Sequence, residues 1–307
     1  MDVLLLIISE IIAPVFVLIF VGVLLQRKFQ MDLSTLSKVN FYYLIPAVIF
    51  LRIYESSLSF ELIGNVLLFL FIQAAGLWVA SYAGSKIFGY QRDYRVTLQN
   101  SILLNNQGNF GLPVNALVFR NDPFAASIQI IIMTFQNILT FTYGVFSMGA
   151  SKQGAKKAAA GFVKMPVLHA LLLGLLFSWA GITLPAAIAI PLDSAAAGFL
   201  AVALMSLGAQ VAYLKLNKNL GIVAISSFLR LLFSPMLALA VIWLLDLSGM
   251  MAQALLISSA FPTSRNSAAI ALEYDNNPDL AAQMVLVSTI LSSITVTAVV
   301  YIAFILF

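Results

Sequence analysis

Apolar segments long enough to cross a membrane follow one another along this chain, and they limit its fold more than any other feature. A transmembrane helix needs about 20 consecutive, mostly apolar residues. Of the 307 residues, 62% are hydrophobic and 9% are charged, whereas soluble domains carry about 25% charged residues. We therefore expect an all-α, polytopic membrane protein embedded in a lipid bilayer. Its ten transmembrane helices are expected at roughly residues 4–26, 34–52, 60–88, 94–119, 124–149, 166–181, 192–213, 219–245, 250–274 and 279–306.

The distribution of lysine and arginine predicts how these helices are oriented. Cytoplasmic loops of membrane proteins carry an excess of both residues. Twelve of the sixteen cationic residues fall in the loops after predicted spans 1, 3, 5 and 7, whereas Arg52 and Arg120 fall in the opposite loops. We expect the twelve on the cytoplasmic side of the cell (plasma or inner) membrane, with both termini outside. The twelve are Arg27, Lys28, Lys38, Lys86, Arg92, Arg95, Lys152, Lys156, Lys157, Lys164, Lys215 and Lys218.

A basic cytoplasmic linker at residues 151–165 divides the ten predicted spans into two sets of five, residues 1–150 and 166–307. An odd number of spans gives the two halves opposite orientations, which is the inverted-repeat plan of many secondary transporters. A weak sequence echo supports this division, because residues 121–123 (Asn-Asp-Pro) follow span 4 and residues 276–278 (Asn-Asn-Pro) follow span 9. We therefore expect a five-plus-five inverted repeat.

Span 4 is interrupted at its middle by four amides, two glycines and a proline between residues 104 and 113. Hydrocarbon tolerates such an interruption where it is buried in protein or lines a water-filled cavity. The ends of a broken helix attract anions at its N-terminus and cations at its C-terminus. Asn105, Asn106, Asn109 and Pro113 are therefore candidate substrate-binding residues, and Asn105 with Asn109 is a candidate cation site. The alternative is a proline kink with locally satisfied polar groups.

Span 9 contains a matching interruption between residues 258 and 267, which is polar and includes a proline. Arg265 stands within it, and a charge at that depth is costly and marks a functional site by default. Interruptions at corresponding positions of two inverted halves indicate a substrate site near the middle of the membrane. Pro262, Thr263, Arg265 and Asn266 join the candidate substrate-binding residues.

Two further polar side chains lie inside predicted spans and have two interpretations each. Arg230, in span 8, is a candidate for sensing an anionic substrate or a coupling ion, and it could equally pair with a carboxylate or a carbonyl. Gln136, in span 5, is a candidate for facing the site, and it could equally form an interhelical hydrogen bond. Both are kept as candidate substrate-binding residues.

Several classes of function are disfavoured by what the sequence lacks. The chain has no cysteine and a single histidine, His169, so thiolate and multi-histidine metal sites are excluded. It has no phosphate-binding glycine motif, which argues against ATP-driven pumping. The net charge of +4 reflects membrane topology rather than nucleic-acid binding. Neither clustered histidines nor paired carboxylates suggest a membrane-embedded enzyme. A channel or sensor is a further alternative, although paired broken helices favour alternating access.

The chain resembles the prokaryotic branch of the auxin efflux carrier family. The resemblance rests on residues 106–113, on Pro166, on Arg230 ahead of Pro235, and on residues 262–292. It implies a ten-helix inverted repeat, similar to bile-acid/sodium symporters and sodium/proton antiporters, in which broken helices 4 and 9 cross. It implies transport of organic anions, such as auxin in plants and malate or malonate in bacteria. By this resemblance Asn106 is the crossover asparagine and Gln136 lines the site, and related folds suggest a homodimer.

We therefore expect a secondary transporter of a small organic anion, a carboxylate, that works by alternating access. Arg265 would supply charge, while amides and helix ends orient the carboxylate. The alternative is a sodium- or proton-coupled carrier of bile-acid-like compounds or ions, in which Asn105, Asn109 and free carbonyls coordinate a cation. Apart from H⁺ or Na⁺ as a coupling ion, no cofactor is expected.

Overall fold

The computed structural model describes residues 3–55, 59–148, 166–212 and 220–307, and these residues are almost entirely helical. Among them, seven helices are long and apolar enough to cross a membrane. They coincide with predicted spans 1, 2, 3, 5, 7, 8 and 10, which confirms a multi-pass membrane protein. The predicted linker at residues 151–165 lies outside the described residues. The seven helices are Ile7–Phe29, Leu33–Tyr54, Glu61–Ile87, Pro123–Ser147, Ala186–Val211, Leu220–Leu244 and Pro278–Leu306.

The other three predicted spans are shorter or broken, and both breaks fall where the sequence predicts them. Span 4 becomes α6, η3 and α7, span 9 becomes α15 and α16, and span 6 is the single short helix α11. The described helices (η marks a π-helical turn) are α1 (Val3–Leu6), η1 (Ile7–Ile12), α2 (Ala13–Phe29), α3 (Leu33–Val39), η2 (Asn40–Leu44), α4 (Ile45–Tyr54), α5 (Phe60–Ile87), α6 (Arg92–Leu103), η3 (Gln107–Gly111), α7 (Leu112–Val118), α8 (Pro123–Leu139), η4 (Thr140–Gly144), α9 (Val145–Ser147), α11 (Pro166–Trp179), α12 (Ala186–Val211), α13 (Leu220–Phe228), η5 (Leu229–Phe233), α14 (Ser234–Leu244), α15 (Gly249–Ser259), α16 (Arg265–Glu273) and α17 (Pro278–Leu306).

The predicted start of span 7 is wrong, because α12 begins at Ala186 rather than at residue 192 and contains Pro191. Pro185 occupies the position before the helix in an extended conformation, where its missing N–H is not needed. Pro191 lies in the second turn and removes one intrahelical hydrogen bond. The helix therefore tolerates a proline that the sequence suggested would lie outside it.

Four prolines inside the membrane segments directly follow the start of an α-helix that a π-helical turn precedes. Pro14, Pro46, Pro113 and Pro235 each stand at the second residue of an α-helix that directly follows such a turn. Proline lacks an N–H and its ring clashes with the carbonyl four residues earlier. At η1, η2 and η5 the residue before the proline donates instead to the carbonyl five residues earlier. The wider turn thus relieves the clash, and it is a feature common at functional sites.

The chain forms two compact units, each of which draws segments from both halves of the sequence. Unit 1 comprises Met1–Ile63, Gly108–Thr134 and Val163–Tyr213. Unit 2 comprises Gly64–Gln107, Phe135–Phe162 and Leu214–Phe307. The two pieces of span 4 therefore belong to different units, with α6 in unit 2 and α7 in unit 1.

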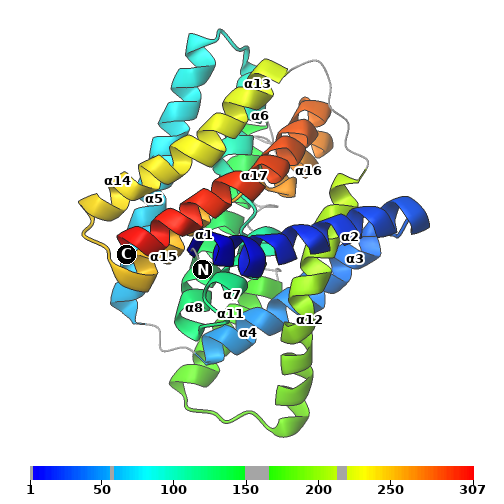
Figure 1. The fold of residues 1–307 in the computed structure, drawn as a ribbon, viewed down its shortest axis with the longest axis vertical. Coiled ribbons are helices and arrows are strands. Elements are labelled where there is room, and N and C mark those ends of the chain that lie inside the picture. Colours follow the sequence, from blue (N-terminus) through cyan, green and yellow to red (C-terminus); the bar gives the residue numbers. More distant parts are fainter. Residues whose placement is uncertain (1–2, 56–58, 149–165, 213–219) are drawn as a thin grey trace. The chain divides into compact units, whose positions relative to one another are not determined.

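In unit 1, α2 crosses α12 (Figure 1), and α4 packs against both α11 and α12. Two glycines allow α2 and α12 to touch backbone to backbone. A methyl group at Gly22 would lie 2.0 Å from the Met205 carbonyl oxygen, and one at Gly208 would lie 1.8 Å from the Ile19 carbonyl oxygen. The contact is reciprocal, because each glycine lies three residues after the carbonyl that the other one meets. Small residues serve this purpose at membrane helix interfaces.

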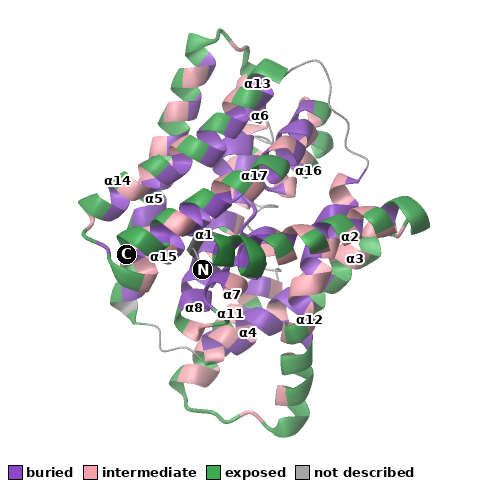
Figure 2. Ribbon diagram, in the orientation of Figure 1, coloured by how far each residue is buried: buried purple, intermediate pink, exposed green. Residues whose placement is uncertain are grey.

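In unit 2, α13, η5 and α14 continue one another and run beside α17 (Figure 1), while α6 packs against α13, α16 and α17. The buried apolar side chains between these helices include Leu98 and Ile102 of α6 and Met284 of α17. This packing holds the C-terminal end of α6 inside the unit. In each unit, the residues between packed helices are buried and those on the outward faces of the helices are exposed (Figure 2).

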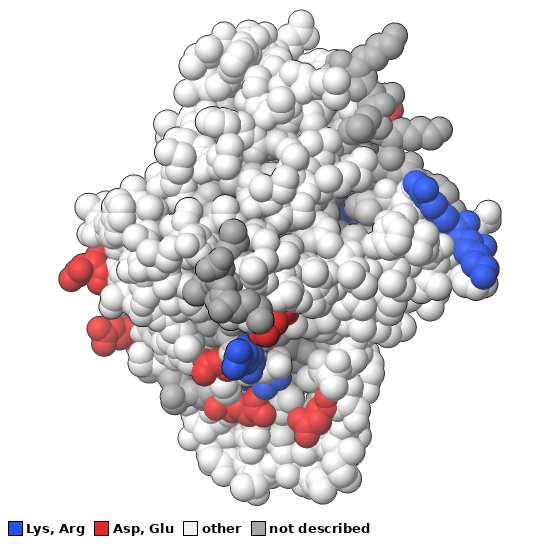
Figure 3. Space-filling model, in the orientation of Figure 1, with Lys and Arg blue, Asp and Glu red and all other residues white. Residues whose placement is uncertain are grey.

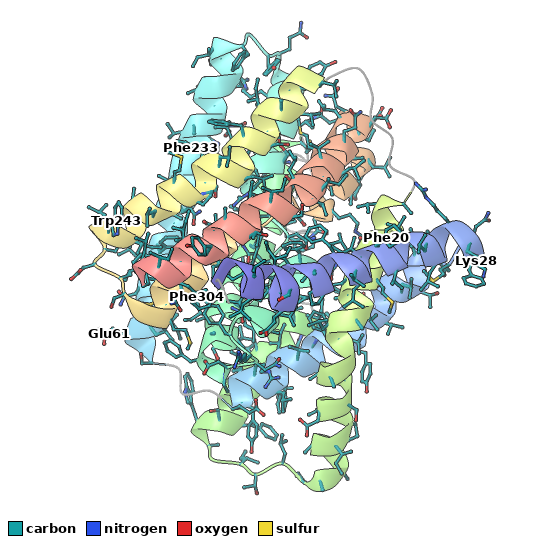
Figure 4. The ribbon with its side chains drawn as sticks, in the orientation of Figure 1. Phe20, Lys28, Glu61, Phe233, Trp243 and Phe304 are labelled. Atoms are coloured by element: carbon teal, nitrogen blue, oxygen red, sulfur yellow. The ribbon has the colours of Figure 1, made fainter. Side chains whose placement is uncertain are left out.

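The exposed faces are apolar, as expected for a protein surrounded by lipid. Phe20 on α2 is 59% exposed and Trp243 on α14 is 63% exposed, and both are visible in Figure 4. The face seen in Figure 3 carries few charged side chains. Lys28 lies in the last turn of α2 and Glu61 in the first turn of α5, where each charge complements the helix dipole.

Candidate functional site

The two interrupted segments meet inside unit 2. Asn105 and Thr263 form an isolated antiparallel β-bridge. The backbone N–H of Asn106 donates to the carbonyl of Pro262 at 2.8 Å. The structure therefore brings these four candidate residues together, as the resemblance implied. We call this meeting point of the two breaks the crossing.

Residues of the second break satisfy carbonyl groups at the C-terminal end of α6. The hydroxyl of Thr263 donates to the carbonyl of Ser101 at 2.8 Å, and the N–H of Ser264 donates to the carbonyl of Leu104 at 2.7 Å. The N–H of Thr263 in turn donates to the hydroxyl of Ser288 at 3.1 Å. A helix end leaves its last carbonyls without intrahelical partners, so these bonds make the break tolerable in an apolar environment.

Gln136 supplies a further donor to the same helix end. Its side-chain amide, Nε2, donates to the carbonyl of Leu103 at 2.6 Å, and the residue is buried. Gln136 thus forms an interhelical hydrogen bond, which is one of its two interpretations, and that it lines a substrate site stays a prediction.

The C-terminal end of α15 is satisfied by amides of the first break. The carbonyl of Ser258 accepts hydrogen bonds from Nδ2 of Asn105 at 3.4 Å and from Nε2 of Gln107 at 3.0 Å. The carbonyl of the next residue, Ser259, accepts from the hydroxyl of Ser234 at 2.9 Å. The amides that the sequence singled out therefore have a structural task at the crossing.

Arg230 lies between the two helix ends. Its guanidinium donates to the carbonyl of Ile102 at 2.8 Å, to the carbonyl of Ser259, and to the hydroxyl of Ser234 at 2.7 Å. The side chain is 1% exposed, so it pairs with carbonyls, one of the partner types foreseen from the sequence. The sequence did not single out Ser234 as a site residue, although it directly precedes Pro235 and follows Arg230 by one helical turn.

Arg265 begins α16 immediately beyond the crossing. Ser264 caps this helix, since its hydroxyl accepts the N–H of Asn266 at 3.2 Å. Within the described chain, the half-buried side chains of Arg265 and Asn266 form no hydrogen bond or ion pair with other residues. The positive end of the α16 dipole and an uncompensated guanidinium therefore coincide.

Two amides at the crossing retain unused hydrogen-bonding capacity. Oδ1 of Asn105 is buried and has no hydrogen-bond partner in the described chain, and the residue is 8% exposed. The side chain of Asn106 is also buried, and none of its atoms bonds to another described residue. Buried polar groups are usually paired, so these two amides keep the capacity for a further hydrogen bond.

The remaining candidates, Asn109 and Pro113, belong to unit 1. Oδ1 of Asn109 accepts a hydrogen bond from Nδ2 of Asn40 at 2.8 Å. Pro113 lines a pocket of about 310 Å³ in this unit, together with the Arg52–Glu55 ion pair of 3.0 Å. The other eight candidates lie in unit 2.

A crossing of two broken, apolar helices whose freed backbone groups satisfy each other defines a multi-pass membrane protein with a built polar centre, the arrangement used by carriers. Residues 7–301 match the family described as membrane transport protein, and the chain belongs to this family. The match confirms the resemblance to auxin efflux carriers that the sequence suggested.

A curated relative extends the same conclusion. The chain is 26% identical over 293 residues to an uncharacterized transporter of Methanothermobacter thermautotrophicus, and the aligned region covers 94% of this chain and 95% of the relative. The protein is therefore a membrane transporter.

Proposed function

We propose that this transporter is a secondary carrier of small organic anions, in particular carboxylates such as malate or malonate. The observation that carries this proposal is the unpaired side chain of Arg265 at the N-terminal end of α16. A cation and a helix N-terminus together favour a negatively charged group. Charge-assisted hydrogen bonds to a carboxylate are roughly twice as strong as neutral ones.

In this proposal the residues of the crossing have two kinds of task. Arg265 binds the carboxylate, and the free amides of Asn106 and Asn266 donate hydrogen bonds to it. Asn105, Pro262, Thr263 and Gln136 hold the backbone in place through the bonds described above. Asn109 and Pro113 belong to unit 1 and remain candidate substrate-binding residues.

We further propose ten membrane spans in a five-plus-five inverted repeat, with residues 1–150 and 166–307 as its halves. Seven long helices together with α11 and the two interrupted segments support this count. Alternating access would then follow from movement of one bundle against the other. The proposed location is the cell inner membrane, with both termini outside.

This topology can be tested by labelling, because the chain has no cysteine. A thiol introduced by Lys156→Cys should react with an impermeant maleimide only from the cytoplasmic side. A thiol introduced by Asp122→Cys should react only from outside. Labelling of both from the same side contradicts the proposed repeat.

The substrate class is tested by uptake of radiolabelled malonate and malate into proteoliposomes. Arg265→Ala should lower the initial rate at subsaturating substrate by about 10- to 100-fold, because a hydrogen bond to a charged group contributes about 1.5–3 kcal/mol. Arg265→Lys should retain part of the rate. The matched control is Arg120→Ala, whose side chain is 88% exposed and which should transport normally.

Two results would contradict the proposal. If Arg265→Ala transports at the wild-type rate, the role assigned to Arg265 is wrong. If wild-type protein carries neither these acids nor other small carboxylates, the substrate class is wrong.

A second candidate function is a sodium- or proton-coupled carrier of bile-acid-like compounds or ions with the same fold. It is favoured by Oδ1 of Asn105, a buried acceptor without a partner that suits a bound cation. Replacing choline by sodium should then raise the melting temperature of wild-type protein but not of Asn105→Ala. Absence of a sodium effect argues against sodium coupling, and uptake driven by a pH gradient tests the proton.

A further inference from the structure

The guanidinium of Arg230 occupies the space between two helix C-termini. It donates to the carbonyl of Ile102 near the end of α6 and to the carbonyl of Ser259 at the end of α15. These carbonyls lie 157 residues apart in the sequence. Arg230 is the largest of the fully buried side chains within the described residues, so it touches neither lipid nor bulk water.

Among the described residues, no acidic side chain forms an ion pair with this buried charge. The ion pairs formed within the described residues are Arg52 with Glu55 and Arg120 with Glu10, both in unit 1. An isolated ion in a medium of low polarity is strongly disfavoured. The compensation has to come from dipoles, and each helix C-terminus carries about half a negative charge. Two such ends supply about one negative charge, which matches one guanidinium.

The surrounding groups hold the guanidinium in this position. The hydroxyl of Ser234 accepts from Arg230 at 2.7 Å and from Nε2 of Gln73 at 3.1 Å, while it donates to the carbonyl of Ser259 at 2.9 Å. The π-helical turn η5 contains Arg230 and ends directly before Ser234. A hydroxyl with one donated and two accepted bonds has no capacity left, whereas Nε of Arg230 has no hydrogen-bond partner within the described residues.

We propose that Arg230 is a cation built into the chain, which takes the place that a bound metal cation would otherwise fill between the C-terminal ends of α6 and α15. Carbonyl groups at paired helix C-termini form a cation site, and here a side chain permanently occupies it. Arg230 is therefore a positioning residue that holds the crossing together rather than a group that touches substrate. The carbonyls of Ile102 and Ser259 are consequently withheld from any coupling ion.

The test is removal of Arg230 and replacement of its charge from solution. Arg230→Ala should lower the melting temperature of the purified, detergent-solubilised protein by roughly 5 °C or more. Guanidinium chloride at non-denaturing, millimolar concentration should restore part of this loss, whereas choline chloride at equal ionic strength should not. Wild type and the matched control Arg52→Ala should show no such rescue. The readout requires no substrate and is therefore independent of the proposed function.

A second comparison separates charge from packing and applies even if Arg230→Ala does not fold. Arg230→Lys keeps the positive charge, and Arg230→Met keeps much of the length but is neutral. The proposal expects the melting temperatures to fall in the order Arg, Lys, Met. If the Met variant is as stable as the Lys variant or more so, or if guanidinium fails to stabilise a folded Arg230→Ala protein, the proposal is overturned.

Discussion

The contact between α2 and α12 permits a prediction whose size follows from the structure. A methyl group added at Gly22 would lie 2.0 Å from the Met205 carbonyl oxygen, and one added at Gly208 would lie 1.8 Å from that of Ile19. Ordinary contacts between carbon and a carbonyl oxygen are about 3.3 Å or longer. The added methyl group and the facing carbonyl oxygen would therefore have to move apart by about 1.3–1.5 Å.

Separation of α2 and α12 loosens packing along both helices rather than at one point. Overpacking of this kind typically costs about 1–3 kcal/mol. Gly22→Ala and Gly208→Ala should each lower the melting temperature of the purified protein, measured by differential scanning fluorimetry in one detergent. Because the first substitution already separates the helices, the double variant should lose less than the sum of the two single losses.

The matched control is Gly198→Ala on the same helix, α12, where an added methyl group meets nothing within 4 Å. Alanine is a better helix former than glycine by about 1 kcal/mol, so this variant should be at least as stable as wild type. If Gly22→Ala or Gly208→Ala melts together with Gly198→Ala, the close backbone contact does not determine stability and the reasoning is refuted.

Three further predictions concern single hydrogen bonds. Thr263→Val removes the hydroxyl that satisfies the carbonyl of Ser101 and should cost about 1–3 kcal/mol in thermal or denaturant unfolding, whereas Thr263→Ser should cost much less. Gln136→Leu leaves the carbonyl of Leu103 at the end of α6 without this donor and should destabilise the protein by a similar amount. If Gln136→Leu is as stable as wild type, this hydrogen bond does not stabilise the crossing. The carboxylate of Asp32 caps α3, and the Thr35 hydroxyl that donates to it holds its pKa below the ordinary value of 3.8. The stabilisation of α3 by this cap should be complete above pH 3.8 and should be lost as the pH falls through the lowered pKa. The loss should be measured as faster amide exchange in the first turn of α3, and Asp32→Asn should abolish this pH dependence.

The interruptions could be predicted from the sequence because they oppose their surroundings. Amides, prolines and an arginine within apolar segments, as at Asn106 and Arg265, have no ordinary explanation in a membrane helix. Local composition is sufficient to locate such contrasts. The same reasoning located the seven long spans, apart from the start of span 7, because length and hydropathy are also local properties.

What the sequence could not reveal were the partners of the polar groups. The bond between Arg230 and the carbonyl of Ile102 joins residues 128 positions apart, and no local pattern indicates which carbonyl is left free. The close approach of Gly22 and Gly208 to carbonyls of the facing helix could not be predicted for the same reason. Glycine is common in membrane helices of every kind. The π-helical turns before Pro46 and Pro235 were missed because sequence rules for proline predict a kink or an end, without specifying how the backbone relaxes.

The β-bridge at the crossing has a consequence for how such a carrier could change its substrate. Bonds between the two interrupted segments, such as that from the N–H of Asn106 to the carbonyl of Pro262, join main-chain atoms. Main-chain bonds of this kind form with almost any side chain. In the proposed site, substitutions at residue 106 or 265 would therefore alter the side chains offered to a solute while the main-chain bonds of the crossing persist. A membrane protein with such a frame can acquire new specificities without first rebuilding its fold.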